Sequence, residues 1–133
     1  MLDWEWAVER LERARNYWIC TARDDGGPHA APVWALWHGE AIVFSTSPDS
    51  AKGRHLARDP RVLVHLESGD EVVIVEGEVE RIPLDEDIVA AYAAKYDFRP
   101  EPSEDGLWFR VRPSAGYAWT EQAFPRTATR FRP

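Results

Sequence analysis

The chain has 133 residues, of which 44% are hydrophobic and 29% charged, a composition typical of one folded domain. Its net charge of −7 disfavours general binding to nucleic acids or anionic membranes, because both reward a basic surface. The only cysteine, Cys20, excludes a disulfide framework and a cysteine-rich zinc site. The charged N-terminus lacks the apolar core of a signal peptide, and no apolar run is long enough for a membrane span. We therefore expect a soluble, cytoplasmic protein with one domain over residues 1–133.

The first third of the chain predicts one helix followed by strands. Asp3 can cap a helix whose apolar residues recur at helical spacing. Gly26 and Gly27 permit positive φ, so the DDGG segment is typical of a hairpin turn. Pro32 has no N–H to donate, which favours a sheet edge or a break in the ladder. In chain order, the expected elements are a helix from residue 3, a strand at 17–23, a turn at 24–27, an extended segment at 29–37, a turn at 38–40 and a strand at 41–47.

The remainder predicts two more helices and several strands. A helix that begins near Ala51 should end at Asp59, because the residue before a proline is pushed out of the α region. Gly77 inside a long strand predicts a bulge or a close approach of two backbones. An acidic start and Lys95 near the end are typical of a further helix. The expected elements are a helix at 51–58, strands at 61–67 and 71–82, a helix at 84–96, a loop at 97–106, strands at 107–113 and 115–121, and an extended tail at 122–133. Six or seven strands with three peripheral helices predict a mainly β, α+β fold built on a small β-barrel.

A basic turn stands out in this acidic chain. Residues 47–61, SPDSAKGRHLARDPR, hold four basic side chains against two acidic ones. Where a strand runs into a helix start, hydroxyls, unpaired N–H groups and a lysine can converge on a phosphate. The alternative is that Ser50 or Asp49 caps a short helix and that the basic residues are solvated. The candidate phosphate ligands are Ser45, Thr46, Ser47, Ser50 and Lys52.

A second feature is the apolar segment APVWALW at 31–37, next to the strand AIVFSTS. Val33, Trp34, Trp37 and Phe44 on neighbouring strands could form a flat wall for an aromatic ligand, although ordinary barrel core is the alternative. The four histidines show no metal-ligand spacing, so we expect no metal site and treat them as surface or satisfied residues.

In this order, these segments resemble the pyridoxamine-phosphate-oxidase-like split β-barrel superfamily, specifically its flavin/deazaflavin oxidoreductase branch. The resemblance rests on DGGPH, APVWALW, IVFSTSPDSAKGRHLARDPRVLVHLE and VVIVEGEVERI, and is tight over about residues 15–83. It implies a six- to seven-stranded antiparallel split β-barrel that forms an obligate homodimer. It also implies two equal sites at the subunit interface, each of which binds FMN or the deazaflavin F-420.

The resemblance assigns positions to the cofactor. Ser45, Thr46, Ser47, Ser50 and Lys52 match the residues at its phosphate end. Pro32, Val33 and Trp34 match the strand whose backbone faces the ring. The C-terminal Arg/His substrate motif of true pyridoxamine-phosphate oxidases is not found, and no histidine follows His65 to ligate haem, so vitamin B6 synthesis and haem are disfavoured.

The leading hypothesis is a flavin- or deazaflavin-dependent oxidoreductase that exchanges a hydride with a small conjugated organic substrate. Because the cofactor ring itself carries the hydride, no catalytic side chain can be named from the sequence. Two alternatives remain: a non-catalytic protein that stores, carries or senses FMN or F-420, and a dimeric structural domain whose basic turn is merely solvated.

Overall fold

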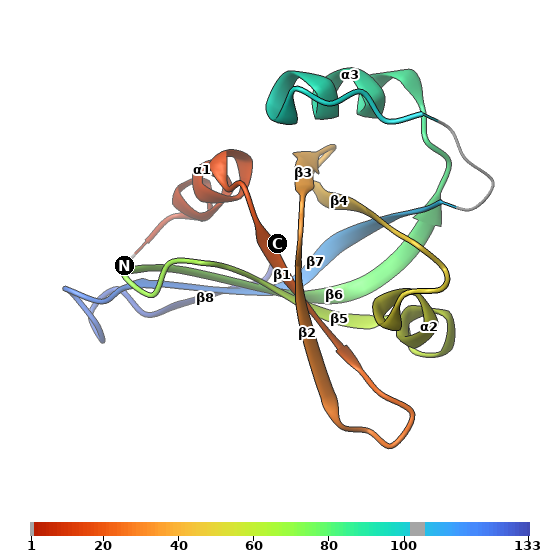
Figure 1. The fold of residues 1–133 in the computed structure, drawn as a ribbon. Coiled ribbons are helices and arrows are strands. Elements are labelled where there is room, and N and C mark those ends of the chain that lie inside the picture. Colours follow the sequence, from red (N-terminus) through yellow and green to blue (C-terminus); the bar gives the residue numbers. More distant parts are fainter. Residues whose placement is uncertain (1, 102–105) are drawn as a thin grey trace.

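The computed structural model describes residues 2–101 and 106–133, which contain three helices and eight strands (Figure 1). The elements are α1 (Trp4–Arg13), β1 (Tyr17–Ala22), β2 (Pro28–Val33), β3 (Ala35–His38), β4 (Ala41–Thr46), α2 (Ala51–Arg58), β5 (Arg61–Leu66), β6 (Glu71–Ile82), α3 (Glu86–Tyr96), β7 (Leu107–Thr120) and β8 (Thr129–Phe131). None of the helices in these two ranges is long and apolar enough to cross a bilayer. The predicted loop at 97–106 lies partly outside the described residues.

All strands form one antiparallel sheet whose order explains its curvature. The order is β2-β1-β5-β6-β7-β4-β3, with β8 added to β7. The two outer strands, β2 and β3, are consecutive in the chain and are joined by Trp34 alone. A single residue cannot cross the width of a flat sheet, so the sheet curls until its edges meet, and the barrel is split at this point (Figure 1). This confirms the predicted mainly β split-barrel class, and Pro32 lies on an edge strand as expected.

Three segments differ in detail from the sequence prediction. The extended segment at 29–37 is two strands, because the chain passes from one sheet edge to the other at Trp34. The two strands expected at 107–121 are one strand, β7, with a bulge that leaves Ser114 outside the pairing with β6. The tail is extended only at β8, since hydrogen bonds such as Thr127 N–H to Ala123 C=O close turns before it. Gly77 lies at this bulge, where a Cβ would come within 2.7 Å of the Arg112 carbonyl oxygen, so the predicted close approach is confirmed.

The sheet buries side chains on both faces. The inner cluster fills the barrel and includes Ile42 and Phe44 of β4, together with the apolar face of α1 and Leu56 of α2. The outer cluster includes Val43 of the same strand and lies under α3. Because β4 is covered on both faces, its sequence reads as a continuous apolar run rather than an alternation.

Candidate functional site

The basic turn links the end of β4 to α2 and is held by a small hydroxyl network. The Ser50 hydroxyl accepts the Gly53 N–H at 3.0 Å, donates to the Ser47 carbonyl at 2.7 Å and lies 2.8 Å from the Thr46 hydroxyl. A hydroxyl has one proton and two lone pairs, so these three bonds fully occupy Ser50. Ser50 is therefore the N-cap of α2, as one of the two sequence interpretations expected. Its hydroxyl shapes the turn and leaves no spare donor for a ligand.

Donors nevertheless remain at this turn. The Ser47 side chain is exposed, and its oxygen accepts the Asp49 N–H at 3.2 Å while its own proton stays available. The first N–H groups of α2, at Ala51 and Lys52, have no partner within the helix. The helix dipole adds a partial positive charge there.

Lys52 differs from the other cations of residues 47–61. Each arginine of this segment is held by a protein oxygen: Arg54 by the Asp49 carbonyl, Arg58 by Asp24 and the Ala22 carbonyl, and Arg61 by the Asp59 carboxylate. Hydrogen bonds from Arg61 lower the pKa of Asp59 to about 2, so this pair stays charged over the physiological range. Within residues 2–101 and 106–133, no carboxylate or carbonyl pairs with the Lys52 ammonium. This cation stands beside the helix start with its charge uncompensated.

Ser45 does not lie beside the other predicted phosphate ligands. Alternate residues of a strand face opposite sides of the sheet. Thr46 shares the inner face with Phe44, whereas Ser45 shares the outer face with Val43 and stands opposite Trp108 of β7. The predicted set of hydroxyls is thus divided between the two faces of β4.

The residues predicted to face the cofactor ring lie at the far end of β2. Pro32 is exposed on the outer face, and Val33 packs against the inner cluster. Trp34 belongs to neither the β1–β2 nor the β3–β4 ladder, so sheet pairing does not occupy its backbone groups. Its indole stacks on Tyr96 of α3, with ring centroids 4.6 Å apart and an interplanar angle of 5°, beneath the guanidinium of Arg15. The side chain thus anchors α3, which leaves the backbone to contact a ligand.

A histidine pair that sequence reasoning did not place lies beside α2. His29 of β2 stands opposite Thr21 of β1, and its ring meets that of His55 edge-on, with centroids 5.0 Å apart. Nδ1 of His55 lies 2.8 Å from the Thr21 hydroxyl. Burial and the nearby charges of His55, Arg23 and Lys52 lower the pKa of His29. Only the β1–β2 register brings these residues together, so no local sequence signal could have revealed the pair.

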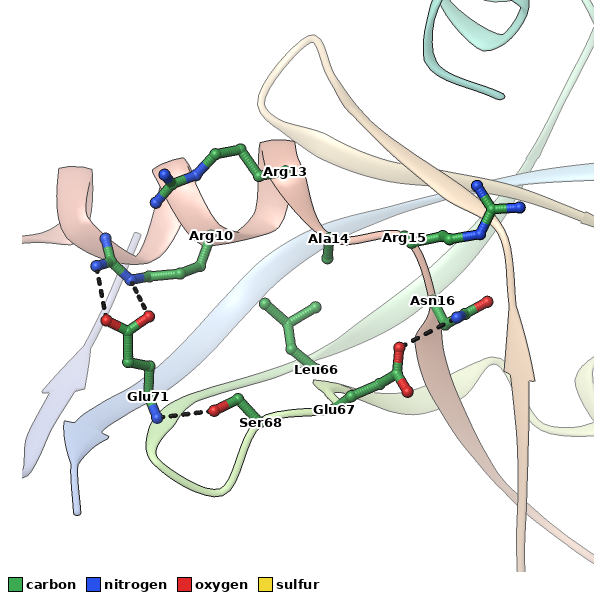
Figure 2. A pocket seen from close by; sticks show the side chains of 9 residues that line it. All are labelled: Arg10, Arg13, Ala14, Arg15, Asn16, Leu66, Glu67, Ser68 and Glu71. Carbon is green, nitrogen blue, oxygen red and sulfur yellow. Dashed lines mark hydrogen bonds and ion pairs between the residues drawn. The ribbon is translucent and has the colours of Figure 1, made fainter. Parts of the chain in front are cut away.

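Four cavities formed by the described residues lie elsewhere. One cavity, of about 340 Å³, lies between the end of α1 and the β5–β6 turn. Here Arg10 donates two hydrogen bonds to the Glu71 carboxylate, and Asn16 donates one to Glu67 (Figure 2). Three others, of about 450, 630 and 450 Å³, are all lined by Arg112, and the first and third also by Gly39. None of these four cavities includes a residue predicted to bind the cofactor.

Comparisons with known proteins agree with this architecture. The sequence profile of the family "Pyridoxamine 5'-phosphate oxidase" matches residues 4–120, and the chain belongs to this family. A pyridoxine/pyridoxamine 5'-phosphate oxidase of Sphingopyxis alaskensis is 35% identical over 118 residues, which are 85% of this chain and 52% of that protein. Its counterpart in Pseudomonas paraeruginosa is 31% identical over 118 residues, 85% of this chain and 53% of that protein. The chain thus spans about half the length of the curated relatives it matches.

Solved structures extend the likeness. A protein described as an F420 reductase superimposes with a TM-score of 0.67 and 28% identity, covering 81% of this chain and 93% of that one. A heme-binding protein of Mycobacterium smegmatis shares the fold. It superimposes with a TM-score of 0.73 and 21% identity, covering 99% of this chain and 60% of that one. The curated relatives are named as oxidases and the first of these structural neighbours as a reductase.

Proposed function

We propose that this protein is an oxidoreductase that binds FMN or F-420 and exchanges a hydride with a small conjugated organic substrate. The observation that carries the proposal is Lys52, a cation without a protein partner in the described chain, beside the exposed Ser47 hydroxyl and the free N–H groups at the start of α2. Such a group of donors suits a phosphate. The ring of the bound cofactor would supply the redox chemistry, and the protein would bind and orient it.

The two parts of the proposed site are far enough apart to need an elongated ligand. The end of β2 at His29 lies against α2, while Val33 and Trp34 lie at its other end. Four residues of a strand span about 13 Å at about 3.3 Å per residue. A ligand with a phosphate at one end and a flat ring at the other, joined by a flexible chain, matches this separation. Orthophosphate or an isolated ring could contact only one part.

A second copy of the chain would complete the site, and the outer face of the sheet supports this part of the proposal. Directly paired residues share a face. Trp18 stands opposite Pro32 and His65, and Ile74 stands opposite His65 and Tyr117. None of these five residues belongs to either buried cluster. A partly exposed row with two large aromatic residues is typical of an interface, and Pro32 at its end joins it to the proposed ring site.

Fluorescence titration of the purified protein with FMN, F-420 and riboflavin tests the proposal, with the seven tryptophans as reporters. We expect tight binding of FMN or F-420 and much weaker binding of riboflavin, which lacks the phosphate. Tight binding of one cofactor alone would identify it. If neither cofactor quenches the tryptophan fluorescence, the proposal fails.

The substitution Lys52→Ala tests the phosphate contact directly. A hydrogen bond to a charged group contributes about 1.5–3 kcal/mol, so we expect a loss of affinity of about 10- to 100-fold. Arg61→Ala is the matched control, because it removes the same charge from the same segment but from a side chain already paired with Asp59. Equal effects of the two substitutions would contradict a specific contact at Lys52. Binding without turnover of any enone, quinone or nitro acceptor would favour a cofactor carrier over an enzyme.

A further inference from the structure

The histidine pair beside α2 has a polar atom without a partner. Nδ1 of His29 is buried, although the side chain as a whole is partly exposed, and it forms no hydrogen bond with the described residues. A buried polar atom without a partner costs about 1–3 kcal/mol, so such atoms are commonly satisfied by a ligand or an ordered water. The edge-on contact with His55 holds the ring of His29 in place.

The same pair adjoins the proposed phosphate site. Lys52 and His55 are three residues apart on α2, so their side chains lie on one face of the helix. Because the His55 ring contacts that of His29, all three side chains gather between α2 and the end of β2. Lys52 lies at the N-terminal turn of α2, and the two histidines extend this group of side chains toward β2.

The charges that face His29 are almost all positive. From α2 these are Lys52 and His55, and from the end of β1 it is Arg23. Two acidic residues of the β1–β2 turn are already engaged: Asp24 pairs with Arg58, and Asp25 accepts the Gly27 N–H at 2.8 Å. In the free protein this field disfavours a proton on His29, in agreement with its lowered pKa. An anion placed among these groups would reverse the sign of the field.

We propose that His29 and His55 form a proton-linked part of the anion site, in which His29 takes up a proton from solvent when a phosphate-bearing ligand binds at the start of α2. The proton converts Nδ1 of His29 from an unsatisfied atom into a charged donor. Binding and protonation then favour each other, and affinity rises as the pH falls. This inference rests on the phosphate site proposed above and adds a pH response to it.

The test is an NMR titration of the four histidine rings between pH 5 and 9. It is run on the free protein, with FMN, with F-420, and with sodium sulfate, an anion that does not titrate in this range. We expect the pKa of His29 to be low in the free protein and to rise with each anion that binds. Affinity should gain about tenfold from high to low pH for each unit of that rise. His38 of β3 is an internal control whose ring signals should not respond to the anion, because it lies on a different strand from the histidine pair.

The variant His29→Gln supplies a second readout. It retains a hydrogen-bonding side chain but cannot be charged, so we expect its affinity for the cofactor to change far less between pH 8 and pH 6 than that of the wild type. An unchanged His29 pKa in the presence of a bound anion would overturn the inference, as would a variant with the full pH dependence. If neither cofactor binds, the proposed function fails. The sulfate titration then still decides whether His29 responds to an anion.

Discussion

Gly53 sets how closely α2 approaches the turn before it. A Cβ at this position would clash with the Ser47 carbonyl oxygen and lie 3.0 Å from Cα of Pro48. Both are backbone atoms and cannot rotate away. The absence of a side chain therefore allows Ser50 to cap the helix while Lys52 stays beside the turn.

Substitution Gly53→Ala tests this role. Alanine normally stabilises a helix by about 1 kcal/mol relative to glycine, but overpacking against fixed backbone costs about 1–3 kcal/mol. We expect a net loss of stability in urea unfolding, together with weaker cofactor binding. Gly69→Ala is the control, because no atom lies within 4 Å of a Cβ there and it should be nearly neutral. A stabilised Gly53→Ala variant would show that the turn can move without loss.

Helix α3 stabilises the break between β2 and β3. Tyr96 OH accepts the Ala35 N–H at 2.9 Å, and Lys95 Nζ donates to the Ala35 carbonyl at 2.9 Å and to the Tyr17 hydroxyl at 2.7 Å. Two neighbouring side chains of the helix thus satisfy backbone groups next to the split. Burial lowers the pKa of Lys95 to about 8 and raises that of Tyr96 to about 12; it also raises the pKa of Tyr17.

These shifts predict an unusual pH profile of stability. Between pH 8 and 10, the unfolded chain still holds the Lys95 proton that the folded chain has lost, so stability should rise with pH. Above pH 10, the folded chain keeps the tyrosine protons that the unfolded chain loses, so stability should fall. We expect Lys95→Met to abolish the rise and retain the fall in urea unfolding series from pH 7 to 11. A wild-type curve that declines steadily from pH 8 would contradict the buried position of Lys95.

The outer face of the sheet carries a row of partly exposed apolar and aromatic residues that the strand register defines. Its central row joins β2, β1, β5, β6 and β7, and a second row, through Cys20 and Leu63, runs beside it. Helix α3 covers a different part of the sheet, at Leu36, Val43 and Trp108. A second copy of the chain is the partner that we propose for this face.

Substitution Ile74→Asp tests the proposed dimer, because a charge at the centre of an apolar interface is strongly unfavourable. We expect a shift to monomer in sedimentation velocity at micromolar concentration and the loss of cofactor binding. Ala90→Asp, on an exposed position of α3, is the control and should change neither property. A wild-type protein that is already monomeric under these conditions would refute the interface.

Local chemistry made much of the fold predictable. Glycines at 26 and 27 mark the first hairpin, Pro60 ends α2, and Gly77 marks the close approach of β6 and β7; each acts through its own backbone or its nearest neighbours. Five of the eight residues assigned to the cofactor come from the strand-to-helix pattern of the basic turn as well as from the family resemblance, and the contacts of all eight with a ligand stay a prediction. For Ser45, the alternation along β4 argues against a place beside Ser47 and Lys52.

The sequence by itself determined the mainly β class, most of the strands and helices, and the basic turn before α2, because these depend on contacts within a few residues. Only the tertiary structure decided where the barrel splits, which cation of the turn lacks a partner, and that His29 meets His55. The split and the histidine contact depend on strand register and sheet closure, which bring together residues as distant in the chain as His29 and His55, 26 positions apart. The partners of the cations depend on how the turn folds, since Arg54 and Arg61 pair with residues five and two positions away.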